Sequence, residues 1–275
     1  MKKKKRHTCI LTIAGSDSSA GAGIQADIKT ISALGGYGVS VITAVTAQNT
    51  KTVAGIHEIP AEFVKLQIET IFSDIKIHAV KTGMLRSAKI IETVVQMLKT
   101  YKVSNVVVDP VMVSKSGSEL LNTDAINILK TQLIPLATIV TPNIPEASIL
   151  AGIQIKKKHD VEKAGRIILS LGPKAVLIKG GHLKGVKCID YLFIKEKNKK
   201  ITVTPLENRR IKTKNTHGTG CSLASAIAVY LAKGYDIRKA VKLATDYIYM
   251  TIYWGASYKI GKGNGPLHHF FKLWH

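Results

Sequence analysis

The chain reads Asn215-Thr216-His217-Gly218-Thr219-Gly220-Cys221 and continues directly into a helical pattern. Apolar residues then recur at the spacing of one buried helix face, at Leu223, Ala226, Ile227, Tyr230 and Leu231. Glycine lets the backbone approach a ligand closely, and the first N–H groups of a helix have no partner within the helix. The stretch therefore predicts an anion site at a helix start, with an ordinary glycine turn before a core helix as the alternative.

Both ends of this helix carry a further signal. Gly234 stands just past the last turn, where a left-handed backbone ends a helix at low cost. Cys221 stands at the start, where a cysteine can become a thiolate or polarise a neighbouring group.

Length and composition favour a globular enzyme-sized domain. The 275 residues are enough to bury a large core, in either one α/β domain or two small ones, and no apolar run approaches the length of a membrane span. The basic start, residues 2–6, resembles the charged end of a signal peptide, but Asp17 follows too soon, so we expect a buried first strand. Cys9, Cys188 and Cys221 show no metal-ligand spacing, so we predict neither a disulfide framework nor structural zinc, and a cytoplasmic protein.

The formal net charge of +22 is the most extreme bulk property of the chain. The lysine runs are not interleaved with aromatic residues, and no nucleic-acid-binding motif accompanies them. We therefore expect no specific nucleic-acid partner. A basic surface would favour polyphosphate ligands, or it records a compositional bias without function.

Short apolar runs alternate with helical patterns along most of the chain. The expected strands are residues 10–14, 39–46, 79–82, 106–108, 138–140 and 175–178, and the expected helices include 24–34, 61–72 and 90–98. This alternation predicts a mainly parallel sheet with helices on both faces. Residues 188–193 and 201–203 are expected to form a hairpin.

Polar clusters follow the expected strands just beyond their carboxyl ends. They are Gly15-Ser16-Asp17, Gln48-Asn49, Lys81-Thr82-Gly83, Asp109, Thr141-Pro142-Asn143 and Lys179-Gly180-Gly181-His182. In open α/β sheets the ligand crevice lies at those ends, so the clusters predict an enzyme site there.

Known phosphate-binding motifs narrow the chemistry. No Walker A sequence is present, since Gly263 stands where Ser or Thr is required after Gly261-Lys262. The segment 21–26 matches the dinucleotide-binding pattern GxGxxA, but it begins six residues after the first strand. No acidic residue ends the second strand to hold a ribose hydroxyl, so a reductase is the weaker alternative.

Phosphoryl transfer needs an anion cradle, a divalent metal and a cation for the transferred group. Asp109 and Glu146 could bind magnesium through their oxygens, although a carboxylate at a helix start is the alternative for each. Lys179, in a glycine-rich turn after a strand, is a candidate phosphate contact or an ordinary surface lysine. His268-His269 have no ligand partners at helical spacing, so we expect a packing or surface role.

The motifs together resemble the bacterial hydroxymethylpyrimidine/phosphomethylpyrimidine kinases of the ribokinase-like superfamily. The matching stretches, in order, are 13–30, 46–50, 81–85, 109–112, 141–146, 179–182, 215–221 and 263–269. The resemblance covers practically the whole chain. It implies a single domain over residues 1–275 with a three-layer α/β/α ribokinase-like fold, usually found as a dimer.

The resemblance also implies an activity. ATP, with Mg²⁺, would phosphorylate 4-amino-5-hydroxymethyl-2-methylpyrimidine and then its monophosphate in thiamine diphosphate biosynthesis. No fusion domain follows, so we expect the stand-alone form of the enzyme. Side activity on vitamin B6 substrates is possible because pyridoxal-type kinases share the cradle, and a non-catalytic nucleic-acid binder is the alternative from another class.

Site residues carry over by position. The pyrimidine would lie among Gly15, Asp27, Gln48, Met84 and Val111; catalysis would involve Lys179, Gly218, Gly220 and Cys221; the nucleotide would meet Thr141, Lys179, Thr216, His217 and Thr219; and Asp109 and Glu146 would hold the metal. A Gln amide offers a donor and an acceptor to an aminopyrimidine edge, and an Asp accepts from its exocyclic amine. Ser18 and Ala20 stand where relatives often have proline and glycine.

Cys221 occupies the position where many superfamily relatives carry an aspartate base. A free cysteine has a pKa of about 8.5, which a helix N-terminus lowers, so we expect a thiol that can act as a base near neutrality. Only the first phosphorylation deprotonates an alcohol, because the second acceptor is already an anionic phosphate. Cys221→Ala is therefore expected to impair the first step more than the second.

Overall fold

The computed structural model describes residues 7–112, 121–181, 187–196, 198 and 200–274. Within them the chain forms one nine-stranded sheet in the order β3-β2-β1-β4-β5-β6-β7-β8-β9. The strands are β1 (Cys9–Asp17), β2 (Tyr37–Gln48), β3 (Val53–Glu58), β4 (Ala79–Thr82), β5 (Val106–Val108), β6 (Ile139–Val140), β7 (Ala175–Ile178), β8 (Lys187–Lys195) and β9 (Ile201–Arg209). All pairs from β2 through β7 are parallel, which confirms the mainly parallel sheet.

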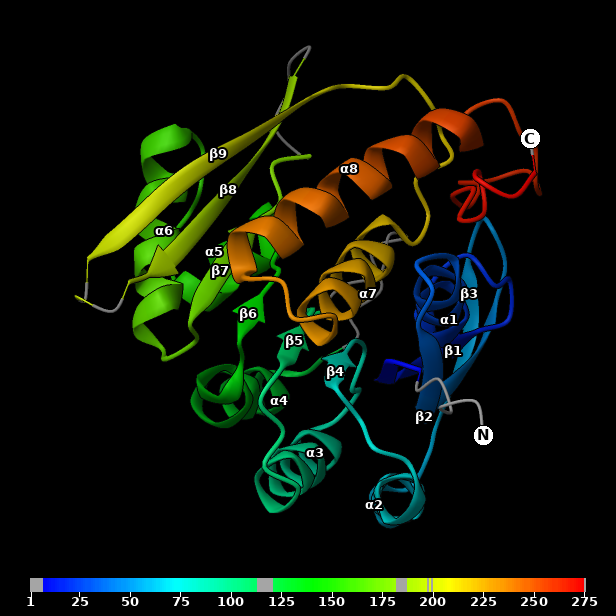
Figure 1. Ribbon diagram of the computed structural model, residues 1–275, viewed down its shortest axis with the longest axis vertical. Coiled ribbons are helices and arrows are strands. Elements are labelled where there is room, and N and C mark those ends of the chain that lie inside the picture. Colours follow the sequence, from blue (N-terminus) through cyan, green and yellow to red (C-terminus); the bar gives the residue numbers. More distant parts are fainter. Residues whose placement is uncertain (1–6, 113–120, 182–186, 197, 199, 275) are drawn as a thin grey trace, which may run out of the picture.

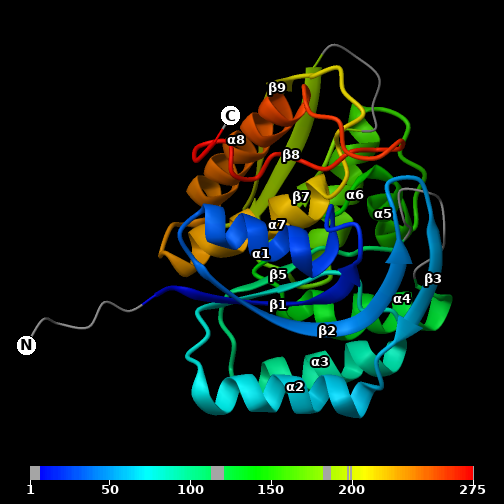
Figure 2. The same ribbon diagram turned by 90° about the vertical axis from the view of Figure 1, so that its right-hand side faces the viewer.

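Helices cover both faces of the sheet, so the predicted three-layer α/β/α fold is confirmed (Figures 1 and 2). One face carries α1 (Gly23–Ala33), α7 (Thr219–Ala232) and α8 (Ile237–Gly255). The other carries α2 (Ala61–Asp74), α3 (Ala88–Thr100), α4 (Thr123–Ile128), α5 (Ile144–Ala151) and α6 (Lys158–Ser170), with a π-helical turn (Leu129–Leu133) and a 3₁₀ turn (Ile134–Leu136) after α4.

The alternation of side chains along the central strands builds two cores. Val107 of β5 packs with α7 and α8, whereas Val106 and Val108 pack on the opposite side with α3 and α4. Successive side chains of a strand point to opposite faces, so an uninterrupted apolar run such as this one needs helices on both. This is why the short all-apolar runs could be recognised as central strands.

Helix α7 is buried more completely than its sequence pattern predicts. Every residue from Ser222 to Val229 is buried, and not only the expected stripe of apolar positions. The helix is enclosed because it lies between the sheet and α8 and also packs on α1 (Figure 1). The predicted stripe is confirmed, with Tyr230 only half-buried, but the positions between its members are buried as well. The small residues Ala224, Ser225 and Ala228 let the neighbouring elements approach there.

The edges of the sheet are antiparallel. The predicted hairpin is confirmed as β8 and β9, which are longer than expected. At the other edge β3 pairs antiparallel with β2, a strand that no pattern predicted. No helix in the described part of the chain is both long and apolar enough to cross a membrane.

Candidate active site

A cavity of about 900 Å³ opens at the carboxyl ends of the parallel strands. Its walls come from the ends of β1, β2, β4, β5 and β7 and from the start of α7, as the polar clusters predicted. Most of the predicted site residues line it: Gly15, Gln48, Met84, Asp109, Val111, Glu146, Lys179, Thr216, His217, Gly218, Thr219, Gly220 and Cys221. Asp27 and Thr141 do not.

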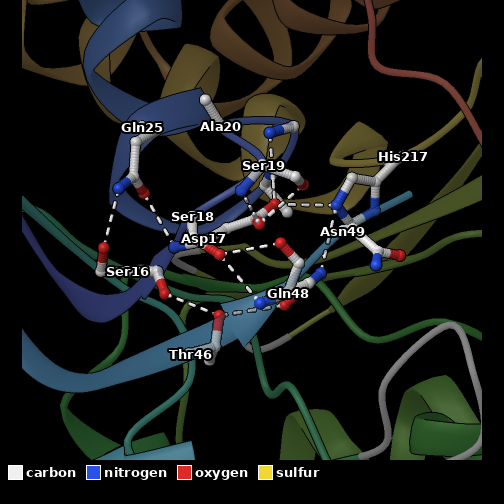
Figure 3. A network of polar contacts seen from close by, with 12 residues as sticks. Ser16, Asp17, Ser18, Ser19, Ala20, Gln25, Thr46, Gln48, Asn49 and His217 are labelled. Carbon is white, nitrogen blue, oxygen red and sulfur yellow. Dashed lines mark hydrogen bonds and ion pairs between the residues drawn. The ribbon is translucent and has the colours of Figure 1, made fainter. Parts of the chain in front are cut away.

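Asp17 organises one end of this cavity (Figure 3). Its Oδ1 accepts hydrogen bonds from the backbone N–H and the hydroxyl of Ser19, at 2.8 and 2.7 Å. Its Oδ2 accepts from the N–H groups of Gly21 and Ala22 and lies 2.8 Å from Nε2 of His217. Burial alone would raise the pKa of Asp17, but these donors outweigh it and lower the pKa to about 2.

The side chain of Gln48 lies beside this carboxylate and completes a cluster that we call the amide end: Asp17, Gln48 and His217. The amide nitrogen of Gln48 is 3.3 Å from Nε2 of His217, and its oxygen is 3.2 Å from the hydroxyl of Thr46. The backbone of Gln48 is held by the Ser18 hydroxyl, which contacts both its N–H and its carbonyl at 2.8 Å. β2 and the loop after β1 are thereby joined at the point where a flat polar ligand edge could bind.

The opposite end of the cavity carries buried charges, and we call it the charged end: Lys81, Asp109, Glu146, Lys179 and Cys221. Nζ of Lys179 lies 2.9 Å from Oδ1 of Asp109. Burial alone would lower the pKa of Lys179, but the two neighbouring carboxylates raise it. Burial and the charge of Asp109 raise the pKa of Glu146 to about 7 against the opposing effect of Lys179. The lysine is thus firmly cationic beside two carboxylates that compete for it.

Glycines let the start of α7 approach both the loop after β1 and Lys179. Gly218 has a φ of 81°, and a Cβ there would collide with the carbonyl oxygen of Gly21. A Cβ at position 220 would lie 3.2 Å from Nζ of Lys179. The first turn of α7 therefore places next to a lysine backbone N–H groups that have no partner within the helix, although the N–H of Thr219 also donates to the Thr216 carbonyl at 3.4 Å. This is the arrangement of an anion cradle.

The thiol of Cys221 behaves differently from expectation. Burial raises its pKa to about 11, although the nearby Lys81 and a hydrogen bond from the Gly23 N–H act in the opposite direction. The expected lowering at the helix start was therefore wrong, because the thiol is enclosed and loss of hydration outweighs the helix dipole. Near neutrality the site as described holds a neutral thiol.

Comparison with known proteins identifies the family. Residues 17–268 match the family model described as phosphomethylpyrimidine kinase. The chain is 45% identical over 265 residues to the hydroxymethylpyrimidine/phosphomethylpyrimidine kinase of Rhizobium meliloti, covering 96% of this chain and 97% of that protein. The chain belongs to the phosphomethylpyrimidine kinase family. It is accordingly a phosphotransferase, and the function that the motifs suggested is in agreement with these relatives.

Two further relatives of this kinase show how widely the domain is used. A thiamine biosynthesis bifunctional protein of Geobacter sulfurreducens is 49% identical over 260 residues, which cover 94% of this chain but 52% of that protein. The chain thus spans about half the length of that relative. The ADP complex of Bacillus subtilis pyridoxal kinase is 38% identical with a TM-score of 0.88, over 98% of this chain and all of that one.

Two predicted contacts of the kinase are not what the structure shows. Asp27 is fully buried behind the cavity wall, where its carboxylate accepts from Thr12, Ser225 and Lys81 at 2.6 to 2.9 Å. A direct contact with a substrate amine conflicts with that burial. Thr141 is also fully buried, and its hydroxyl donates to Asp109 instead of facing a nucleotide.

His217 lies at the amide end, where its Nε2 contacts Asp17 and Gln48, and its predicted contact with a nucleotide stays a prediction. Thr216 and Thr219 line the cavity, and the hydroxyl of Thr219 donates to the carbonyl of Thr216 at 2.8 Å. Their predicted contact with a nucleotide stays a prediction. His182 lies outside the described residues.

Sequence reasoning did not assign a role to Asp17 or Lys81. Lys81 is fully buried and holds both oxygens of Asp27, which ties β4 to α1 directly behind Cys221. Its signal was present, since a lysine between Val80 and Thr82 interrupts an otherwise apolar central strand. His268 and His269, for which a packing or surface role was expected, are both buried, which decides for packing, and Nε2 of His269 lies 2.9 Å from the hydroxyl of Ser222.

Proposed function

We propose that this kinase uses ATP to phosphorylate 4-amino-5-hydroxymethyl-2-methylpyrimidine and then its monophosphate, on the route to thiamine diphosphate. The observation that carries the proposal is that one cavity joins the amide end to the charged end. A pyrimidine edge would be recognised at Gln48 while the hydroxymethyl group, or later its phosphate, points toward the start of α7. Both steps then use one binding orientation.

Recognition of the ring is assigned to the amide end. A Gln side chain offers one donor and one acceptor side by side, which matches the amine and the adjacent ring nitrogen of the aminopyrimidine. Met84 and Val111 line the same cavity and would cover the ring faces. Gly15 leaves room for the side chain of Met84, because a Cβ at position 15 would collide with its methyl group.

Phosphoryl transfer is assigned to the charged end. The transferred group carries its charge on three oxygens, so catalysis depends on placing fixed positive charge and N–H donors around it. Lys179 supplies the charge, and the first turn of α7, from Thr219 to Cys221, supplies the N–H groups. ADP binding by the similar pyridoxal kinase of Bacillus subtilis supports ATP as the donor.

Asp109 and Glu146 fit a magnesium ion. Mg²⁺ in phosphoryl-transfer sites is bound through one or two carboxylates together with phosphate oxygens and water. The two carboxylates lie in one buried region, where burial first and the charge of Asp109 second raise the pKa of Glu146. Among the residues that the structure describes, no group of three or more His, Cys, Asp or Glu side chains could hold a metal. The ion would neutralise charge on the phosphates, and Lys179 and Thr141 hold Asp109 in place for it.

Cys221 is proposed to accept the proton of the substrate hydroxyl in the first step only. The neutral thiol of the described site must lose its proton before it can do so, so the first step should be the more dependent on pH. In the second step the acceptor is already an anion, and the same residue only shapes the cradle.

We further propose that the enzyme acts as a homodimer in the cytoplasm, with its small-molecule substrates as its specific ligands and no nucleic-acid or membrane partner. Sedimentation at several protein concentrations tests the dimer. A single monomeric species at micromolar concentration would contradict it.

The function is tested by an ADP-release assay with three acceptors: the pyrimidine alcohol, its monophosphate and pyridoxal. We expect turnover of both pyrimidines. Pyridoxal is the second candidate, because the similar Bacillus subtilis structure is a pyridoxal kinase. We expect at most a side activity with it, and turnover of pyridoxal alone would reject the main proposal.

A further inference from the structure

The ring nitrogen Nε2 of His217 is shared by two side chains of the amide end (Figure 3). Oδ2 of Asp17 lies 2.8 Å from it, and the amide nitrogen of Gln48 lies 3.3 Å from it. The side chain of Asp17 is 4% exposed and that of His217 is 12% exposed, so water does not replace either contact. These three groups cannot all keep their present roles, because the contact between His217 and Gln48 would bring two hydrogen-bond donors together with no acceptor between them.

The carboxylate decides where the histidine proton lies. An ionised carboxylate only accepts hydrogen bonds, and the other donors around Asp17 keep it ionised. Nε2 of His217 must therefore carry a hydrogen, whether the ring is neutral or charged. The amide nitrogen of Gln48 also carries only hydrogens, so at 3.3 Å it would oppose a donor with a donor.

The hydroxyl of Thr46 meets a second conflict at the other side of the same amide. It lies 2.9 Å from the carbonyl oxygen of Ser16 and 3.2 Å from the amide oxygen of Gln48. Both are acceptors, and a hydroxyl has one hydrogen to give. A buried polar group left without a suitable partner is costly, so one of the two contacts has to change its character.

A single rotation removes both conflicts. We infer that the Gln48 amide is turned over, with Oε1 facing His217 and Nε2 facing Thr46, and that His217 and Asp17 are positioning residues that fix this orientation. Nε2–H of His217 then donates to both Asp17 and Gln48, and Nε2 of Gln48 donates to the Thr46 hydroxyl, which donates to Ser16. Each group then has a complementary partner. The turn exchanges the positions of Nε2 and Oε1 of Gln48 and leaves the other heavy atoms in place.

The histidine is well placed to impose this choice. Its backbone N–H donates to the carbonyl of Gly265 at 3.0 Å, and its ring packs where a Cβ on Gly21 would collide with Cδ2. The ring can neither withdraw nor slide along the loop. Thr46 is the weaker constraint, because its hydroxyl hydrogen can turn from the Ser16 carbonyl toward Gln48, whereas Asp17 fixes the hydrogen on Nε2 of His217. The direction of the amide is thus set from the side of His217.

The consequence is substrate specificity, and this step rests on the proposed function. A turned amide presents an acceptor on the side of His217 and a donor on the side of Thr46. The hydroxymethyl group, directed to the charged end, fixes which way round the ring lies. The edge of a 4-aminopyrimidine then presents its amine N–H and its ring nitrogen in a set order, and only one direction of the Gln48 amide matches that order. The corresponding 4-oxo-pyrimidine offers carbonyl oxygen and then ring N–H, so a fixed amide rejects it.

The ratio of kcat/KM for the 4-amino over the 4-oxo alcohol tests the specificity. We expect a ratio of about 100 or more in the unaltered enzyme. His217→Leu frees the amide and should lower the ratio by about tenfold. His217→Gln places an N–H donor at the same point and should keep the ratio within about threefold of the original. Equal losses on both substrates, with the ratio unchanged in His217→Leu, would overturn the specificity role.

A measurement without turnover separates this inference from the proposed function. ¹H–¹⁵N correlation of the histidine rings, assigned through the His217→Gln spectrum, should show a protonated Nε2 in His217 of the ligand-free enzyme. A bare Nε2 would overturn the inference even if the pyrimidines are phosphorylated. A protonated Nε2 in an enzyme that phosphorylates neither pyrimidine would instead reject the proposed substrate and keep the assigned proton.

Discussion

The two ends of the cavity differ in how their polar groups are stabilised. At the amide end Asp17 accepts five hydrogen bonds, Gln48 is held through backbone and side chain, and the pKa of the carboxylate falls to about 2. At the charged end burial raises the pKa of Glu146 to about 7 and that of the Cys221 thiol to about 11. One end is satisfied before any ligand binds, and the other carries groups whose charged forms are disfavoured.

The contrast follows from what each end must do. A rigid edge that reads a ring gains selectivity when its donors and acceptors are fixed in advance. A cradle for a phosphoryl group must keep charge and N–H donors poorly solvated, because such groups stabilise developing charge most strongly where water is absent. We therefore expect substitutions at the charged end to lower the catalytic rate most, and substitutions at the amide end to lower the free energy of unfolding most.

Lys179→Met at the charged end should have the largest effect. The change keeps most of the side-chain volume but removes the cation beside Asp109 and Glu146. We expect kcat to fall by about 1000-fold for both phosphorylations, in the range seen when one preorganised charge is lost from a transfer site. Steady-state kinetics with saturating pyrimidine and ATP measures it.

The exposed pair Lys187 and Glu207 provides the control, since neither side chain lines the cavity and Lys187→Met removes a salt bridge of similar length, 2.7 Å. It should leave kcat unchanged. A loss below about tenfold in Lys179→Met would mean that the backbone N–H groups of α7 suffice and would break the comparison between the two ends.

Cys221→Ala separates the two chemical steps. The first phosphorylation should fall by about 100-fold because the substrate hydroxyl loses its base, whereas the second should fall by less than about fivefold. In the unaltered enzyme, kcat/KM of the first step should also rise with pH between about pH 7 and about pH 9.5, because the thiolate fraction grows toward its pKa. Single-turnover assays with each acceptor measure both effects. Equal losses in the two steps would assign Cys221 to the cradle alone.

Asp17→Asn tests the stability of the amide end. The lowered pKa means that ionised Asp17 stabilises the fold fully above its ordinary pKa of 3.8, and that this contribution is lost as the pH falls toward about 2. At pH 7 the variant should lose about 2 kcal/mol in the free energy of unfolding. The difference between the two proteins should shrink when both are measured near pH 3. A difference that does not depend on pH would mean that lost packing, and not the charge, is responsible.

Much of the fold was predictable because the strongest local signals coincide with buried elements. The boundaries of β4, β5 and β7 were predicted without error, since each is an apolar run buried on both faces or interrupted only by Lys81. β3 was missed because most of its residues are exposed, it contains Gly55 and His57, and it lies at the sheet edge. A central strand can be recognised from its apolar run, whereas the formation of an edge strand such as β3 depends on pairing with the neighbouring strand.

The site was predictable only in part. Strand ends indicated where polar residues would meet, and the family resemblance added Asp27. Neither indicated which side chains would face the cavity, so Asp27 and Gln48 were treated alike. The contact of Asp17 with His217 joins residues 200 positions apart, which no local pattern contains. The direction of the Cys221 pKa shift depends on how far the thiol is removed from water, and that is a property of the packed molecule.

Ala20→Gly should give the smallest effect and probes how much strain the amide end stores. Ala20 has a φ of 61° in the loop that Asp17 holds, with its N–H bonded to the carbonyl of Asp17 and its own carbonyl accepting from Lys29. A left-handed alanine costs about 1–2 kcal/mol, and the extra freedom of glycine in the unfolded chain offsets about half of that. The variant should therefore gain about 0.5 kcal/mol in unfolding free energy, measured from the denaturant midpoint. The matched change Ala22→Gly, at an extended residue with φ −133°, should destabilise instead. If Ala20→Gly also destabilises the protein, alanine carries no backbone strain at this position. The hydrogen bonds of the loop would then hold it loosely, and the amide end would be less rigid than its contacts indicate.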